Sequence, residues 1–203
     1  MWGGILESSS ADFWINRWEN EKGYICAPLY MYKYTLKGLK NILTKHKVDL
    51  SEKSVLDVGC GRGFYTEFYR RKSAYVLSVD VSNVVVERMR TLYYSASVLD
   101  ISKELPSRFL SYFWVHSTQC LVHQVEEEDF KKACCNLSHL VEEGGYLLVG
   151  DRFLPDKKID KPHIRYRNVT DYILAIGDYR LRLLDIVPSF PLGGRLLLFR
   201  RGV

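Results

Sequence analysis

A glycine-rich turn directly after a short apolar run is the feature that most constrains this chain. Residues 54–58 are typical of a buried strand, and Gly59, Gly61 and Gly63 follow them before a helical pattern begins at Phe64. Glycines at such a turn let the backbone bend sharply and approach a ligand without side-chain obstruction. Because Phe64 occupies the last glycine position of G-x-G-x-x-G, the turn differs from dinucleotide-binding loops. It therefore indicates a ligand loop of another kind.

Strand-like and helical segments alternate after residue 51, which indicates a parallel, doubly wound sheet. The last two strand-like segments are separated only by residues 188–194, a gap too short for a helix, so they must pair antiparallel. We therefore predict an α/β fold with a seven-stranded, mostly parallel sheet that ends in an antiparallel hairpin. The expected strands are 54–58, 74–79, 94–99, 109–115, 146–150, 180–187 and 195–201, and the expected helices are 64–72, 84–92, 126–141 and 169–176.

The first 50 residues have a different character, helical and rich in aromatic side chains. Apolar residues recur at helical spacing within 29–47, which predicts a helix packed on the core. We expect one domain over 1–203, with an N-terminal helical lid over 1–50 and a Rossmann-like core over 51–203. Trp14, Trp18 and Tyr24 can cover a substrate pocket with the basic segment 156–168, or they can simply belong to the core.

Composition narrows the class of protein. Hydrophobic residues make up 47% of the chain, as in folded globular proteins, and the longest apolar runs are too short to cross a bilayer. The N-terminus lacks the features of a secretory signal, so we expect a cytoplasmic protein. The five cysteines show no metal-binding spacing and are expected to be reduced thiols, and no metal is expected. The net charge of +5 can reflect a nucleic-acid surface or scattered, solvated lysines and arginines.

Residues 55–63, VLDVGCGRG, resemble the first motif of class I S-adenosylmethionine-dependent methyltransferases, in which an acidic residue precedes G-x-G-x-G. The resemblance extends from about residue 54 to the end of the chain and includes the final antiparallel hairpin. It implies S-adenosylmethionine as cofactor and S-adenosylhomocysteine as product. The residues it places against the cofactor here are Asp57, Gly59, Cys60, Gly61 and Gly63.

Two further acids follow the next two expected strands. Asp80 lies 80 − 57 = 23 residues after Asp57, about one strand-helix-strand unit, and its carboxylate can accept hydrogen bonds from both ribose hydroxyls. The resemblance implies that Asp100 accepts a hydrogen bond from the adenine amino group, with Val81 and Ile101 flanking the ring. Each acid can instead be a helix cap or a turn residue. Three signals in the family's order favour the cofactor interpretation.

Candidate catalytic residues lie where the fourth expected strand ends. His116 falls at the family's fourth motif, close to the methyl group, so we predict that it contacts the cofactor and acts as a base; it can also merely contact the cofactor or cap a loop. His123 matches a histidine common in small-molecule members, and packing is its expected role. Asp151, at the end of the fifth strand, can orient a substrate or pair with Arg152 or Arg165.

Motifs that would indicate other substrate classes do not occur. The chain has no Asn/Asp-Pro-Pro-Tyr/Phe motif of enzymes that methylate nucleic-acid bases or glutamine, and no Pro-Cys pair for carbon methylation of cytosine. His116 and Asp151-Arg152 stand where magnesium-dependent catechol-type enzymes carry acids or Asp-Asn. We therefore expect metal-independent methyl transfer to an oxygen, nitrogen or sulfur of a small molecule.

Two other functions stay open. One is an RNA or protein methyltransferase that uses the basic segment 152–167 as its contact surface. The other is a catalytically silent cofactor-binding sensor or partner subunit, because Ser111 stands where many relatives have an acid. The aromatic faces of the N-terminal segment can also stabilise a cationic sulfonium. Arg17 can reach the cofactor carboxylate or form a surface salt bridge.

Overall fold

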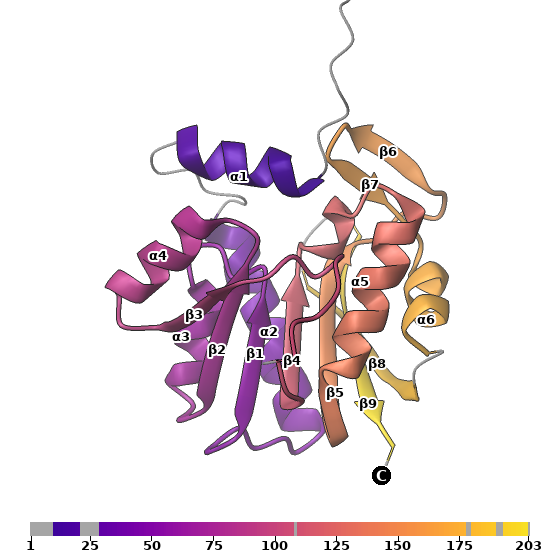
Figure 1. The fold of residues 1–203 in the computed structure, drawn as a ribbon. Coiled ribbons are helices and arrows are strands. Elements are labelled where there is room, and N and C mark those ends of the chain that lie inside the picture. The colour runs from indigo at the N-terminus through magenta and orange to yellow at the C-terminus, as the bar shows by residue number, and fades with distance from the viewer. Residues whose placement is uncertain (1–9, 21–28, 108, 178–179, 190–192, 203) are drawn as a thin grey trace, which may run out of the picture.

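A seven-stranded sheet forms the centre of the molecule, in a computed structural model that describes residues 10–20, 29–107, 109–177, 180–189 and 193–202. The strand order is β3-β2-β1-β4-β5-β9-β8 (Figure 1). The first five of these strands are mutually parallel, whereas β9 runs antiparallel to both β5 and β8. The predicted α/β fold with a final antiparallel hairpin is therefore confirmed. The strands of this sheet are β1 (Ser54–Val58), β2 (Tyr75–Asp80), β3 (Ser95–Val98), β4 (Tyr112–Thr118), β5 (Val141–Arg152), β8 (Leu181–Pro188) and β9 (Gly194–Arg201).

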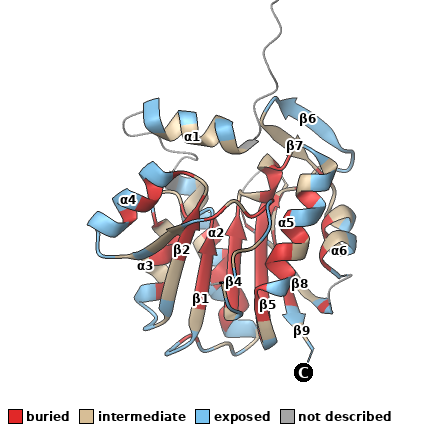
Figure 2. Cartoon of the chain, in the orientation of Figure 1, coloured by how far each residue is buried: buried red, intermediate tan, exposed pale blue. Residues whose placement is uncertain are grey.

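Helices cover both faces of the sheet, so its central strands are apolar on both sides. One core cluster joins the sheet to Phe130 and Leu137 of α5 and to Tyr172 of α6. The cluster on the opposite face joins it to Leu39 and Ile42 of α2 and to two tyrosines of α3. Figure 2 shows this burial concentrated in the strands and on the inner faces of the helices. The helices are α2 (Leu29–Lys45), α3 (Phe64–Arg70), α4 (Asn83–Thr91), α5 (Glu127–His139) and α6 (Val169–Gly177).

The structure corrects the predicted start of the fifth strand. We expected Gly144 and Gly145 to end a helix and the strand to begin at Tyr146, but α5 ends at His139 and β5 already begins at Val141. Val141 pairs with Tyr112 of β4 and Tyr146 pairs with Trp114, so residues 142–145 stand opposite Phe113 alone. Gly144, with φ 74°, adopts a left-handed conformation that favours glycine within this irregular stretch.

The fourth strand also differs from its prediction. We expected it over 109–115, ending at the first polar residue, whereas β4 spans Tyr112–Thr118. His116 pairs in register with Asp57 of β1, and Thr118 pairs with Gly150 of β5. These ladder bonds outweigh the polarity of the side chains, and two of them, His116 and Thr118, hydrogen-bond to each other inside the protein. His116 is consequently part of the sheet, not of the loop after it.

A second, two-stranded sheet forms where we expected an irregular insertion. β6 (Lys158–Lys161) and β7 (Ile164–Tyr166) pair antiparallel and extend above the carboxyl ends of the main strands (Figure 1). Their charged composition hid them, because β6 is Lys-Ile-Asp-Lys and all four residues are exposed. The segment 156–168 is therefore a β-hairpin flanked by short connections.

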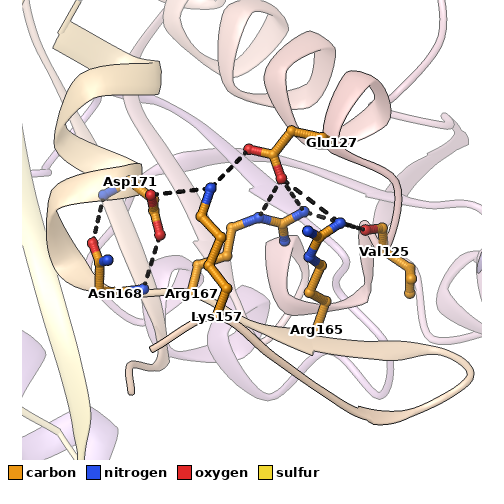
Figure 3. A network of polar contacts seen from close by, with 7 residues as sticks. All are labelled: Val125, Glu127, Lys157, Arg165, Arg167, Asn168 and Asp171. Atoms are coloured by element: carbon orange, nitrogen blue, oxygen red, sulfur yellow. Dashed lines mark hydrogen bonds and ion pairs between the residues drawn. The ribbon is translucent and has the colours of Figure 1, made fainter. Parts of the chain in front are cut away.

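Glu127 anchors this hairpin to the start of α5. Its carboxylate lies 3.4 Å from Lys157 Nζ, 3.8 Å from an Arg165 nitrogen and 3.4 Å from Arg167 Nη2 (Figure 3). Arg167 is fully buried, so its charge needs this partner. Three cations of the basic segment 152–167 are thus paired within the protein.

The same network extends to the start of α6. Lys157 Nζ also lies 3.3 Å from Asp171 Oδ1 (Figure 3). The Asn168 backbone N–H donates to the Asp171 carboxylate, and the Asp171 N–H donates to Asn168 Oδ1, which is a reciprocal capping arrangement. The hairpin is therefore tied to both helices that flank β5.

The first helix, α1 (Ser10–Asn20), lies across the carboxyl ends of the parallel strands, beside the β6–β7 hairpin (Figure 1). None of residues 11–20 is buried. α2 instead packs on the sheet, as predicted for 29–47, although its first residues, Tyr30, Met31 and Tyr32, also line the cavity at the strand ends. Tyr24 and Cys26 lie outside the described residues. In the described ranges, every helix is too short or too polar to span a membrane.

Candidate functional site

A cavity of about 430 Å³ opens where the parallel strands end. Its floor includes the last residues of β1, β2, β4 and β5, and α1 and the β6–β7 hairpin form its opposite wall. This volume is within the range of small-molecule sites, and the carboxyl edge of a doubly wound sheet is where such folds bind ligands.

The glycine turn forms one end of the cavity. The Gly59 and Cys60 backbone N–H groups both donate to the Val79 carbonyl, at 2.9 and 3.0 Å, which fixes the turn against β2. Gly59, Cys60 and Gly61 line the cavity. Gly59 and Gly61 have φ values of 73° and 50°, which favour glycine. The backbone here can approach a ligand closely, as the sequence predicted.

Two other residues of the motif support this turn from outside the cavity. A Cβ on Gly63 would lie 2.6 Å from Met89 Cε, so glycine is needed for packing where α3 begins. Asp57 is buried beneath the turn and accepts a 2.6 Å hydrogen bond from the Thr66 hydroxyl, and burial raises its pKa to about 6. Neither residue lines the cavity, so a direct cofactor contact for Asp57 and Gly63 stays a prediction.

Asp80 and Asp100 line the cavity at the ends of β2 and β3. Asp80 Oδ1 accepts the Ser82 N–H and Oδ2 accepts the Gly61 N–H, both at 3.0 Å, and burial raises the pKa of this carboxyl. Asp100 Oδ1 accepts both the N–H and the hydroxyl of Ser102. The two acids therefore make turn bonds and face the cavity as well, and the two interpretations weighed from the sequence do not exclude each other.

Apolar side chains surround these acids. Val81 and Ile101, predicted to flank an adenine ring, both line the cavity, together with Leu99. Ile101 and Leu99 belong to the core cluster beneath α5, which holds them in place. This end of the cavity thus combines hydrogen-bond acceptors with flat apolar surface.

His116 is the predicted site residue whose position differs most from expectation. Its ring is fully buried within the sheet and does not line the cavity. Trp114 Nε1 donates to the Tyr69 hydroxyl, which therefore donates in turn to His116 Nδ1 at 3.0 Å. Nε2 then carries the proton and donates to Thr118 Oγ1. Both ring nitrogens are occupied, and burial lowers the pKa of His116 to about 3.

The predicted roles of His116 as base and cofactor contact stay untested, but this position argues against both. A ring enclosed by Tyr69 and Thr118 supports the sheet and the start of α3. It has no cavity-facing surface from which to receive a proton from a substrate.

Unlike His116, His123 lines the cavity and can therefore contact a substrate. It lies in the short helix η1 (Leu121–His123) after β4, and its ring lines the cavity. Nδ1 is 2.8 Å from the His163 carbonyl, which can only accept, so Nδ1 is the protonated nitrogen. Burial lowers the pKa of His123 to about 4, so the ring is neutral and Nε2 is its basic nitrogen. From the sequence, this histidine matches one common in small-molecule members of the family, with packing as its expected role.

Rings from distant segments enclose His123. Trp14 of α1 meets it edge-on with centroids 4.5 Å apart, and Phe13 stacks on His163 at 3.7 Å. His163 and Tyr166 of the hairpin line the cavity as well. Arg17 does not line the cavity, and its guanidinium lies 5.8 Å from the Phe13 ring centroid. Its reach to a cofactor carboxylate stays a prediction without support from this geometry.

Asp151 and Arg152 end β5 at the same cavity. Asp151 is fully buried, its Oδ2 accepts a 3.0 Å hydrogen bond from the Tyr172 hydroxyl, and burial raises its pKa to about 8. Arg165 contacts Glu127 and the Val125 carbonyl instead of Asp151. The ion pairs considered for Asp151 do not form with either arginine.

Comparison with known sequences agrees with this geometry. The family model described as "Methyltransferase domain" matches residues 55–145. An uncharacterized methyltransferase of Mycobacterium tuberculosis is 34% identical over 107 residues, which are 50% of this chain and 52% of that protein. A ubiquinone biosynthesis O-methyltransferase of Acinetobacter baylyi is 28% identical over 71% of this chain and 58% of its own length. The chain thus spans little more than half the length of these relatives.

Solved structures share the fold at low sequence identity. Magnesium protoporphyrin IX methyltransferase of Synechocystis, solved with S-adenosylhomocysteine, has a TM-score of 0.71 and 17% identity, covering 95% of this chain and 98% of that one. A Burkholderia thailandensis 1,6-didemethyltoxoflavin N1-methyltransferase has a TM-score of 0.69 and 14% identity, covering 95% and 87%. The [4+2]-cyclase SpnF also matches, with a TM-score of 0.67 and 15% identity over 92% and 86%.

Proposed function

We propose that the chain is a class I S-adenosylmethionine-dependent methyltransferase that methylates an oxygen, nitrogen or sulfur atom of a small molecule, releasing S-adenosylhomocysteine. One observation carries this proposal. The glycine turn, Asp80, Asp100 and His123 all line a single cavity, so the proposed cofactor site and the proposed base share one space. Because SpnF shares the fold and is named a cyclase, the fold alone does not decide the reaction.

The residues at the first end of the cavity fit the cofactor. Asp80 is placed to accept the ribose hydroxyls and Asp100 to accept the adenine amino group, while Val81 and Ile101 flank the ring. Gly59 and Gly61 admit the ligand close to the backbone; a Cβ on Gly59 would already lie 3.2 Å from Cys120. When bound, the cofactor supplies a methyl group on a positively charged sulfur.

His123 is our proposed base. Its Nε2 can accept the proton that the acceptor loses on methylation, while the His163 carbonyl holds the ring through Nδ1. Trp14 packs against the ring and keeps its orientation. Alignment of the acceptor by the cavity walls supplies the other part of the rate enhancement. We propose that the reaction needs no metal.

The alternatives have less support. An RNA or protein methyltransferase would need the basic segment 152–167 at its surface, but Lys157, Arg165 and Arg167 pair with Glu127 (Figure 3). Two of the similar proteins are named for small-molecule chemistry, ubiquinone biosynthesis and a toxoflavin precursor. A silent cofactor-binding protein would not need a cavity-lining base such as His123.

We also propose a cytoplasmic location and the division of the chain into an N-terminal covering segment and a cofactor core. Free thiols support a reducing compartment: Cys60, Cys120, Cys134 and Cys135 are all unbonded to another sulfur. The position of α1 over the strand ends supports the covering role.

Calorimetric titration with S-adenosylmethionine and with NADH tests the cofactor assignment. We expect saturable binding of S-adenosylmethionine and none of NADH; the reverse result would refute the proposal. Incubation with S-adenosylmethionine labelled in the methyl group, against pools of small metabolites, tests the activity. Cofactor binding without label transfer to any pool would favour the silent alternative.

A further inference from the structure

The two ends of the cavity carry opposite charge. Asp80 and Asp100 lie at the cofactor end, whereas Arg152 and Lys161 line the other end, where β5 and β6 finish. The third lining cation, Arg62, belongs to the glycine turn. The adenosine of the cofactor does not need cations at this end of the cavity. We therefore consider Arg152 and Lys161 as contacts for the methyl acceptor.

In the part of the chain that the structure describes, neither cation at this end has a carboxylate partner. Within the described ranges, no carboxylate forms an ion pair with Arg152 or Lys161, whereas three other cations of the same segment pair with Glu127 (Figure 3). The Arg152 Nε is buried and has no hydrogen-bond partner in that part of the chain. A buried guanidinium nitrogen without a partner is costly and indicates a missing acceptor.

Asp151, the sequence neighbour of Arg152, does not supply that charge. Both residues line the cavity, but Asp151 forms no ion pair with Arg152, and its Oδ2 accepts a hydrogen bond from the Tyr172 hydroxyl. Burial raises the pKa of Asp151 to about 8, and the cation that acts on it is Arg167. Burial thus disfavours the charged form of this carboxyl, and it does not serve as the ion-pair partner of Arg152.

Aromatic rings form the walls between these cations. The Arg152 guanidinium lies 5.1 Å from the Tyr166 ring centroid, and Trp14 stands edge-on to His123. Burial, and then the charges of Lys161 and Arg17, lower the pKa of His163, which also lines the cavity. Flat aromatic molecules stack on such walls, and arginine binds oxyanions with two parallel hydrogen bonds.

We infer that the methyl acceptor is a flat aromatic molecule carrying an oxyanion, which Arg152 and Lys161 bind while its methylated atom faces His123. This inference rests on the proposed function and adds the acceptor class to it. Carboxylate and phosphate share the required chemistry, so both are included in the test.

The test measures binding to the full chain saturated with S-adenosylhomocysteine. Calorimetry compares 3,4-dihydroxybenzoate with catechol, which has the same ring and hydroxyls without the carboxylate, and phenyl phosphate with phenol. We expect at least one anion to bind about tenfold more tightly than its neutral counterpart. The phosphate and carboxylate pairs show which oxyanion the site prefers.

Substitutions then test whether Arg152 and Lys161 cause the preference for the anionic probe. Arg152→Gln with Lys161→Gln should abolish the difference between anion and neutral counterpart and leave the dissociation constant of S-adenosylhomocysteine unchanged. Lys158→Gln is the matched control for the Lys161→Gln substitution, because Lys158 is exposed on the same hairpin, does not line the cavity and its replacement also removes one positive charge. It should retain the preference.

Three results would overturn the inference: neutral probes that bind as tightly as the anions, no binding of any probe, or a preference that survives the double substitution. Failure of S-adenosylhomocysteine itself to bind would instead refute the proposed function. Because that titration comes first, the two failures are distinguishable.

Discussion

The two ends of the cavity are built in different ways. At the cofactor end, residues 59–101 follow one another at successive strand ends, and backbone hydrogen bonds such as Gly59 N–H to Val79 O hold them together. At the acceptor end, α1, η1, the end of β5 and the β6–β7 hairpin meet through side chains, as in the contact of Trp14 with His123. Local backbone geometry thus makes the common part of the site, and long-range side-chain packing makes the part that is specific to an acceptor.

Replacing His123 should have the largest effect. His123→Gln removes the proposed base from the acceptor end, and we expect turnover to fall by about 10²- to 10⁴-fold, the usual contribution of a general base. The dissociation constant of S-adenosylmethionine, set by the other end, should stay the same. Single-turnover transfer of a labelled methyl group and calorimetry measure the two quantities.

His116→Gln is the matched control for that experiment, since both histidines are neutral and lie on the same stretch of chain. Turnover of the folded His116 variant should stay within a few-fold of the unsubstituted protein. A larger loss of turnover in the His116 variant than in the His123 variant would instead assign the catalytic role to His116.

Asp80→Ala should affect the cofactor end alone. Loss of charge-assisted hydrogen bonds to the ribose, and of the bond that holds Gly61 N–H, should weaken S-adenosylmethionine binding by about 1–3 kcal/mol, or about 5- to 150-fold. Asp160→Ala, on the exposed strand β6, removes the same charge as a control. An unchanged dissociation constant in the Asp80 variant would remove the ribose role.

The smallest predicted effect is on the free energy of unfolding, and it depends on His116, which lines neither end of the cavity. Its pKa is about 3 in the folded protein and near 6.5 when unfolded, so the unfolded state binds the extra proton. Stability should therefore fall as pH falls, by about 1 kcal/mol more between pH 6.5 and 5.5 than in His116→Gln. Urea unfolding at both pH values measures this; equal losses would contradict the buried neutral ring.

Several residues that line the cofactor end could be predicted from the sequence for a physical reason, and their contacts with the cofactor stay predictions. Glycine spacing and acids at strand ends specify local turns, so Gly59, Gly61, Asp80 and Asp100 lie in the cavity as expected. The acceptor end is formed by contacts between segments that lie far apart in the sequence, and a local sequence pattern does not predict such contacts. His116 is buried inside the sheet because β4 continues past it, and the charged strand β6 of the hairpin resembles a loop in its composition.

The two histidines show most clearly what could not be predicted from the sequence. His116 and His123 are seven residues apart, and both are neutral because burial disfavours the charged ring. Their tautomers are opposite, since His116 accepts from Tyr69 at Nδ1 whereas His123 donates from Nδ1 to a carbonyl. The hydrogen-bond partners in the folded structure decide which ring nitrogen lacks a proton, and the sequence pattern does not identify these partners.

The exposure of α1 has a consequence for ligand exchange. None of residues 11–20 is buried, and ring contacts such as Phe13 on His163 hold the helix over the cavity. Detaching it would break those contacts while leaving the two large core clusters, which contain no residue of α1, intact. Substrate entry and product release can therefore proceed by a local opening whose free-energy cost is far below that of unfolding the sheet.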